Sequence, residues 1–142
     1  MTKLLLSLHV LAAIVAIGPV TVAASMFPAA LRRATPGGTG PTLLHRICRV
    51  YAGLGLLVPV FGLATASSLG VLTDAWLIAS MLLTAVAGVL LAFVILPAQA
   101  AALGGPGKRA AVRLGMVTGV FNLLWATVVV LMVIRPGSTT GV

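Results

Sequence analysis

The side chain best suited to chemistry in this sequence is His9, because it lies in an otherwise apolar stretch. Residues 4–26 contain no Asp, Glu, Lys or Arg, so the imidazole is the ionisable group of that segment. An imidazole inside a membrane-spanning segment can ligate haem or a metal ion, carry protons, or stay neutral and hydrogen-bonded to a neighbouring helix. The residue types alone leave these alternatives open.

Asn122 is the second candidate, because its amide lies near the middle of the apolar run at residues 112–134. An amide at that depth needs a partner, which is either a hydrogen bond to another helix or a contact with a substrate or cofactor. Whether Asn122 and His9 line one cavity depends on how the helices pack.

The other polar residues favour simpler roles. His45 lies beside Arg46 and Arg49, so we expect it at the membrane interface, among anionic head groups. It would lie ~20 Å from His9, too far to share a metal ion. Cys48 is the single cysteine and offers no disulfide or cysteine cluster. Trp76 is expected to be a membrane anchor, and the methionines are expected to pack or face lipid rather than bind copper(I): Met26, Met81, Met116 and Met132.

The composition indicates the elements that position these groups. The 142 residues are 61% hydrophobic and 7% charged, whereas a soluble domain has roughly 25% charged residues. Four apolar runs, at about residues 4–26, 47–69, 75–98 and 112–134, are each long enough to span a bilayer as a helix. The sequence therefore predicts an all-α, polytopic membrane protein, with one domain over residues 1–142 folded as an antiparallel bundle of four transmembrane helices.

The connections and breaks in these runs can also be predicted. Residues 28–44 and 99–113 contain Gly- and Pro-rich segments and are expected to be flexible loops. Asp74 or Thr73 is expected to cap the third helix. Pro19 and Pro59 predict kinks, because proline removes a backbone hydrogen bond.

Small residues at four-residue spacing predict the faces on which the helices meet, since membrane helices associate by close backbone approach. Each of the four helices carries such a row. In chain order the rows are Ala12, Ala13 and Ala16, on the side of His9; Gly55, Pro59, Gly62 and Ala66; Ser80, Thr84, Gly88 and Ala92; and Ala111, Gly115, Gly119, Asn122 and Ala126.

The distribution of charge predicts the topology. Seven of the nine Lys and Arg residues fall in or beside the first and third loops, and two lie near the ends of the chain. Positive residues stay in the cytoplasm, so we expect a multi-pass protein of the bacterial cytoplasmic membrane with both termini outside. The expected partners are the lipid bilayer, anionic head groups at the cytoplasmic face, and a second copy or a membrane complex, but no nucleic acid. A cleaved signal peptide, ending near Ala23-Ala24-Ser25, is the alternative for the first run.

Several short motifs appear in a fixed order along nearly the whole chain: Ser7-Leu8-His9-Val10-Leu11-Ala12-Ala13-Ile14, Asp74-Ala75-Trp76-Leu77, Leu96-Pro97, Asn122-Leu123-Leu124 and Met132-Val133-Ile134-Arg135-Pro136. In these the chain resembles the family of integral membrane proteins called domain of unknown function 2269, which carries no assigned activity. The opening motif is also similar to HemJ-type protoporphyrinogen oxidases and CopD-type copper proteins. That similarity implies a haem-ligating role for His9 alone, because the basic residue on which HemJ-type proteins rely deeper in the bundle has no counterpart here.

The chain has a single acidic residue, and no set of nucleophile, base and acid for hydrolysis is available. The sequence therefore favours a non-enzymatic accessory or interaction protein of the bilayer with no metal site. The alternative is a b-type haem or redox-linked membrane protein with His9 as axial ligand and haem b as cofactor.

Overall fold

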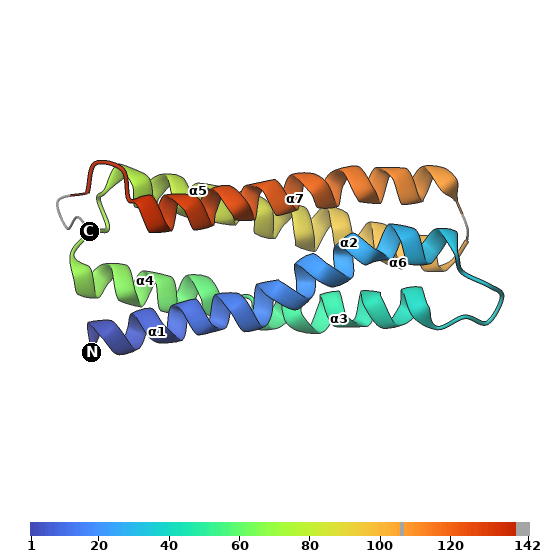
Figure 1. Ribbon diagram of the computed structural model, residues 1–142, viewed down its shortest axis with the longest axis horizontal. Helices are drawn as coiled ribbons and strands as arrows, with labels where there is room; N and C mark the ends of the chain where they lie inside the picture. Colours follow the sequence, from blue (N-terminus) through green and yellow to red (C-terminus); the bar gives the residue numbers. More distant parts are fainter. Residues whose placement is uncertain (106, 139–142) are drawn as a thin grey trace.

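The computed structural model describes residues 1–105 and 107–138, and every regular element within them is a helix. Four helical stretches are long and apolar enough to cross a membrane: Thr2–Arg32, Gly40–Leu69, Ala75–Leu103 and Lys108–Ile134. The shortest has 27 residues, more than the ~20 that the hydrocarbon core requires. The predicted all-α architecture with four membrane-spanning helices is confirmed (Figure 1).

Three of the four stretches are interrupted. The first consists of α1 (Thr2–Ala12), the π-helical segment η1 (Ala13–Ile17) and α2 (Gly18–Arg32). The second consists of α3 (Gly40–Leu54) and α4 (Leu57–Leu69). The third consists of α5 (Ala75–Leu90), the π-helical segment η2 (Leu91–Ile95) and α6 (Leu96–Leu103). The fourth is the single helix α7 (Lys108–Ile134).

Prolines account for all three interruptions. Pro19 follows η1 by two residues, and Pro97 follows η2 by two residues. A proline leaves the carbonyl four residues before it without its N–H partner, and a π-turn lets the chain adjust its hydrogen bonds there. Pro59 deprives the Gly55 carbonyl in the same way, and that carbonyl accepts from the Val58 N–H at 3.1 Å instead. The kinks predicted at Pro19 and Pro59 are confirmed, and the bend before Pro97 is an addition.

The long loop predicted for residues 28–44 is wrong. Helix α2 continues to Arg32, with Pro28 buried inside it, and α3 begins at Gly40. Pro41 lies in the first turn of α3, where its missing N–H costs nothing. The connection is reduced to residues 33–39. The third helix ends at Leu103 instead of the predicted residue 98, and the fourth begins at Lys108 instead of residue 112. The alanine-rich and basic residues of these extensions favour helix outside the apolar core.

The helices form an elongated bundle (Figure 1). The first helical stretch lies beside the second along its whole length, α1 against α4 and α2 against α3, and α2 packs against α7 as well. Helix α5 runs beside α7, and α3 lies against α6. Beyond η1 the first stretch therefore contacts the fourth in addition to the second.

The centre of the bundle combines large and small side chains. One cluster joins the first, third and fourth helices: Val20, Ala87, Leu91, Ile95 and Phe121. On α7 the buried positions follow a spacing of three and four residues, namely Ala111, Leu114, Thr118, Phe121 and Val128.

The predicted rows of small residues are contact faces only in part. In the first two helical stretches Ala16 and Ala66 are buried, and Gly62 lies against the His9 ring. In the third and fourth, Ser80 and Ala111 are buried, but Gly88, Ala92, Gly119 and Ala126 are exposed.

The end of the bundle near the 70–74 connection is held by a polar cluster. Asp74 stands at the N-cap of α5, as predicted, but its carboxylate accepts the Trp76 indole N–H at 3.0 Å instead of a backbone N–H. Trp76 is only 5% exposed, and the Arg135 guanidinium lies 5.5 Å from its ring centroid. The prediction of an exposed membrane anchor at Trp76 is wrong, because the indole joins the ends of α5 and α7.

Candidate functional site

His9 is held by a hydrogen bond between the first and second helical stretches. Its Nδ1 lies 2.9 Å from the backbone carbonyl of Val58 in α4. A carbonyl oxygen only accepts, so Nδ1 carries the proton and donates it. When the imidazole is neutral, this bond leaves the lone pair on Nε2. An imidazole that ligates a metal through one ring nitrogen usually donates the N–H of the other nitrogen to a group such as a backbone carbonyl.

The imidazole fits against α4 because residue 62 is glycine. A Cβ added at Gly62 would lie 3.0 Å from His9 Cε1 and 3.2 Å from Nδ1. The ring therefore covers the one position of α4 that has no side chain, one turn beyond the carbonyl that it binds. The contact fixes the orientation of His9 and the approach of α1 to α4.

Asn122 contacts a different helix. Its Nδ2 donates to Ser25 Oγ in α2 at 2.9 Å, which is the interhelical bond expected of an amide at that depth. The structure does not bring Asn122 and His9 together, since one pairs α7 with α2 and the other pairs α1 with α4.

Asn122 belongs to a row of buried polar atoms on α7. Thr118 Oγ1, Asn122 Oδ1 and Trp125 Nε1 are buried and have no hydrogen-bond partner among the described residues. The spacing of four and three residues places them on one face of the helix. The Trp125 ring packs edge-to-face on Phe121, with centroids 6.4 Å apart. Buried polar atoms left unpaired cost roughly 1–3 kcal/mol each, so this row is a costly feature of the bundle.

A second buried polar group, formed by His45, Gln99 and Cys48, was not predicted from the sequence. His45 is only 8% exposed, and its Nδ1 lies 3.0 Å from Gln99 Oε1. The amide nitrogen of Gln99, Nε2, donates to Cys48 Sγ at 3.7 Å, and both Gln99 and Cys48 are fully buried. The interfacial position predicted for His45 is wrong, because α3 starts earlier and turns this residue toward α6. Gln99 is the only glutamine of the sequence, and a lone amide beside an apolar run is the signal that could have indicated this buried polar group.

Metal-ligating side chains do not gather in the part of the chain that the structure describes. No group of three or more His, Cys, Asp or Glu side chains occurs there. Met26, Met81 and Met116 are exposed on the outer surface, as predicted for lipid-facing methionines.

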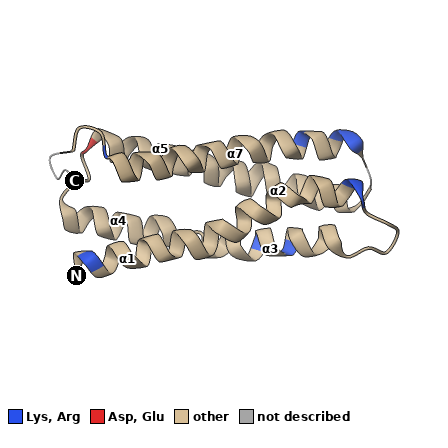
Figure 2. Ribbon diagram, viewed as in Figure 1, with Lys and Arg blue, Asp and Glu red and all other residues tan. Residues whose placement is uncertain are grey.

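The charged residues separate along the bundle. Lys and Arg concentrate where α2 ends, where α7 begins and in the middle of α3, and the single acidic side chain lies at the opposite end (Figure 2). The cations at the basic end, which are Arg32, Arg33, Arg46, Arg49, Lys108, Arg109 and Arg113, therefore have no carboxylate side chain nearby to neutralise them.

Comparisons with models of known protein families, with curated proteins and with solved structures find no match. The similarity to the family of domain of unknown function 2269 stays a prediction.

Proposed function

We propose that this chain is a small, non-enzymatic, multi-pass protein of the bacterial cytoplasmic membrane that binds another membrane protein, or a second copy of itself, through its helices. Its family would be that of domain of unknown function 2269. Four apolar helices support the membrane placement, and within their most apolar windows only 11% to 28% of each is buried inside the chain. Most of the apolar surface is thus available to lipid or to partner helices.

The observation that carries the proposal is the polar pair on the outer face between α2 and α7. Ser25 is exposed, and the hydrogen bond that it forms within the described residues is the one that it accepts from Asn122. A hydroxyl proton facing hydrocarbon without an acceptor is unfavourable. An acceptor on a neighbouring transmembrane helix would satisfy it.

The surroundings of Ser25 suit a helix contact. Val22 and Met26 are more than half exposed on the same side of α2, and Gly119 is exposed on α7. A glycine beside a polar pair lets a second helix approach closely, which is how membrane helices associate. We place the partner on this face.

The orientation follows from the charges. With the basic end in the cytoplasm, both chain ends lie outside the cell, and the seven cations at that end face anionic head groups. This assignment belongs to the proposal.

Photo-crosslinking in native membranes tests the proposal. Val22→Cys in a Cys48→Ser background is labelled with a benzophenone maleimide and irradiated, because Val22 is 59% exposed on the proposed face and the Ser25 hydroxyl is kept. Val60→Cys is the matched control, because Val60 is 58% exposed on α4, away from the proposed face. We expect a discrete adduct with a polypeptide at position 22 and lipid adducts alone at position 60. Lipid adducts alone at both positions, or equal polypeptide adducts at both, would overturn the proposal.

A second candidate function, b-type haem binding, is favoured by the geometry of His9. With Nδ1–H donated to the Val58 carbonyl, Nε2 is the nitrogen that would bind the haem iron. His9 would hold the haem, and the haem would supply one-electron redox chemistry. The test is the absorption spectrum of the chain purified from haem-supplied cells. A Soret band that is lost in His9→Ala and kept in His45→Ala supports it, and a colourless wild-type preparation contradicts it.

A further inference from the structure

The breaks in the first three helical stretches meet at one level of the bundle. In the first stretch η1 ends at Ile17, whose Cδ1 lies 3.4 Å from where a Cβ at Gly55 would be, and Gly55 lies in the break of the second stretch. Three residues after Ile17, Val20 joins the central cluster together with Leu91 and Ile95, which belong to η2 of the third stretch. The three breaks therefore surround one cluster of buried side chains.

Proline makes each of these breaks a place where the helix can bend. Pro19, Pro59 and Pro97 each remove one backbone hydrogen bond from their stretch, and π-turns such as η1 and η2 are frequent at functional sites. The fourth stretch differs, because α7 passes the central cluster at Phe121 without interruption. Three helices can thus bend at the level where the fourth stays straight.

The two halves of the bundle on either side of the breaks are packed differently. In the basic half, α2 and α6 each pack against both α3 and α7. In the other half, which holds the chain ends and which we call the terminal half, α1 packs against α4 and α5 packs against α7. Among the described residues, close backbone approaches between these two pairs are few. The basic half is therefore one connected unit, whereas the terminal half consists of two helix pairs.

Side-chain contacts hold α1 and α4 together as one of these pairs. His9 Nδ1 donates to the Val58 carbonyl at 2.9 Å, and the imidazole covers Gly62. Near the start of α1 the hydroxyls of Thr2 and Ser68 are hydrogen-bonded to each other. Both contacts lie within the pair, so α1 and α4 can move together without breaking either one.

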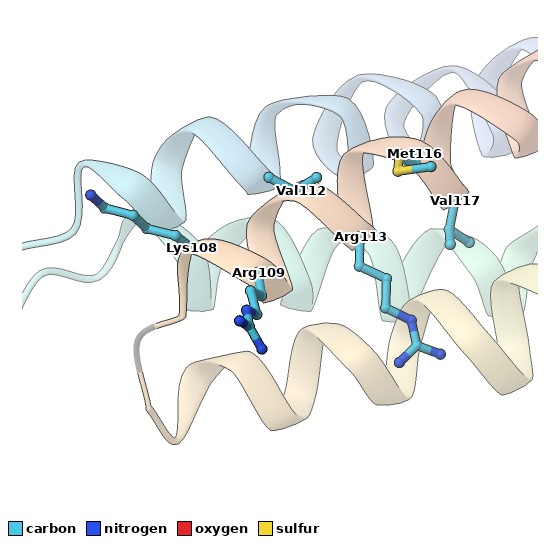
Figure 3. A pocket seen from close by; sticks show the side chains of 6 residues that line it. All are labelled: Lys108, Arg109, Val112, Arg113, Met116 and Val117. Atoms are coloured by element: carbon cyan, nitrogen blue, oxygen red, sulfur yellow. The ribbon is translucent and has the colours of Figure 1, made fainter.

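The basic half is the anchored part of the molecule. Figure 3 shows the first turns of α7, where the side chains of Lys108, Arg109 and Arg113 extend from the helix. Cations at a membrane surface bind anionic head groups, which hold this end of α7 in place. Movement about the breaks is therefore movement of the terminal half.

We propose that the three breaks form a hinge, about which α1 and α4 swing together away from α5 and α7 and admit water to the terminal half. In the structure this half is closed by a small cluster at its tip, where Ala66 of α4 packs with Trp76 and Leu77 of α5. Opening separates that cluster and leaves the contacts of the basic half intact. The inference concerns the chain alone and does not depend on the proposed partner.

An unpaired donor favours the open arrangement. Trp125 lies one turn beyond Phe121, on the terminal side of the breaks, and its ring packs against the central cluster. Its Nε1–H is buried and has no acceptor among the described residues. A buried N–H without an acceptor is unfavourable, and water in the terminal half would supply one.

The side chain that reports the movement is Ser80. It lies one turn beyond Trp76 on α5, and it is 0% exposed although α7 is the one helix that packs closely beside α5. A pair of helices does not bury a side chain completely by itself, so the α1–α4 pair must cover Ser80. When that pair swings away, position 80 meets water.

Maleimide labelling of the chain in lipid vesicles tests the hinge, because maleimide reacts with a hydrated thiolate and not with a buried thiol. The variant Ser80→Cys keeps the native Cys48, which is the matched control, since both positions are 0% exposed but Cys48 lies in the basic half. N-ethylmaleimide is added, and peptide mass spectrometry measures the two thiols of the same molecule separately. Leu72→Cys, which is 45% exposed in the connection before α5, gives the rate of an exposed thiol.

We expect position 80 to react at about 1–10% of the rate of position 72, because a minor conformation is commonly populated to that extent. Cys48 should react at least about tenfold more slowly than position 80. Pro19→Ala/Pro59→Ala restores the missing backbone donors and should slow position 80 by about tenfold. Pro28→Ala, inside the uninterrupted α2, should leave the rate unchanged.

Equal rates at positions 48 and 80, no reaction at position 80, or the same rate with and without Pro19 and Pro59 would overturn the inference. Val128→Cys is the second reporter should Ser80→Cys fail to fold, because Val128 is 3% exposed on α7, two turns beyond Phe121. It should react as position 80 does. A negative result would leave the proposed partner face at Ser25 untouched, because that face lies in the basic half.

Discussion

Replacing Gly62 with alanine should separate α1 from α4. The added Cβ would lie 3.0 Å from His9 Cε1, closer than ordinary contact, and the imidazole cannot move away freely because its Nδ1 is bonded to the Val58 carbonyl. Overpacking of this kind costs about 1–3 kcal/mol. Loss of the interhelical hydrogen bond contributes about 0.6 kcal/mol of that on average. The better helix propensity of alanine offsets about 1 kcal/mol of this cost, so we expect Gly62→Ala to reduce the free energy of unfolding by about 1 kcal/mol.

The assay is equilibrium unfolding in mixed micelles of mild detergent and dodecyl sulfate, followed by circular dichroism. Gly88→Ala is the matched control, because Gly88 is an exposed helical glycine whose added Cβ would meet nothing within 4 Å. Alanine is the better helix former by about 1 kcal/mol, so this control should be neutral or slightly stabilising.

A double-mutant cycle isolates the contact. In a His9→Ala background the added methyl at position 62 meets open space, and Gly62→Ala should then behave like the control. The coupling between the two positions should reach at least ~1 kcal/mol. If Gly62→Ala is as stable as Gly88→Ala in the wild-type background, the placement of the imidazole against α4 is refuted.

Three further substitutions are tested by the same unfolding assay. Gln99→Leu should cost about 1–3 kcal/mol, because it leaves the buried His45 Nδ1–H without its acceptor at 3.0 Å; a neutral outcome would contradict that pairing. Thr118→Val removes a buried hydroxyl that has no partner at nearly constant volume, so we expect stability to be unchanged or raised by up to ~1 kcal/mol, and a clear loss would show that the hydroxyl is bonded. Trp76→Phe removes the indole bond to Asp74 and should cost about 1 kcal/mol, whereas no change would indicate that this bond contributes nothing.

The four spanning helices could be predicted from sequence because their signal is long and depends only on hydropathy. Their ends could not be predicted as well. Pro28 is typical of a helix end, yet it is buried inside α2. Residues 99–113 were predicted to be a loop, but α6 continues through an alanine-rich segment to Leu103 and α7 begins at Lys108. Beyond the hydrocarbon core the apolar signal stops, but the backbone hydrogen bonds of a helix do not.

The pairing of side chains between helices could not be predicted from the sequence, for a different reason. The partner of His9 is a backbone carbonyl, and every residue carries one. The contact depends on the rotation of α4 and on the missing side chain at Gly62. The burial of His45 likewise depends on where α3 begins. Asn122 was predicted to form an interhelical bond, and it does, but Ser25 could not be chosen among the hydroxyls of the other helices.

The most direct test of the central claim, that four helices cross the bilayer with the basic end in the cytoplasm, is cysteine labelling in intact cells. Leu72→Cys and Ala34→Cys, each in a Cys48→Ser background, place an exposed thiol in the connections at opposite ends of the bundle. A membrane-impermeant maleimide should label position 72 in intact cells and position 34 only after the cells are permeabilised. Labelling of both positions from the same side would contradict the four spans, and the reverse pattern would contradict the orientation.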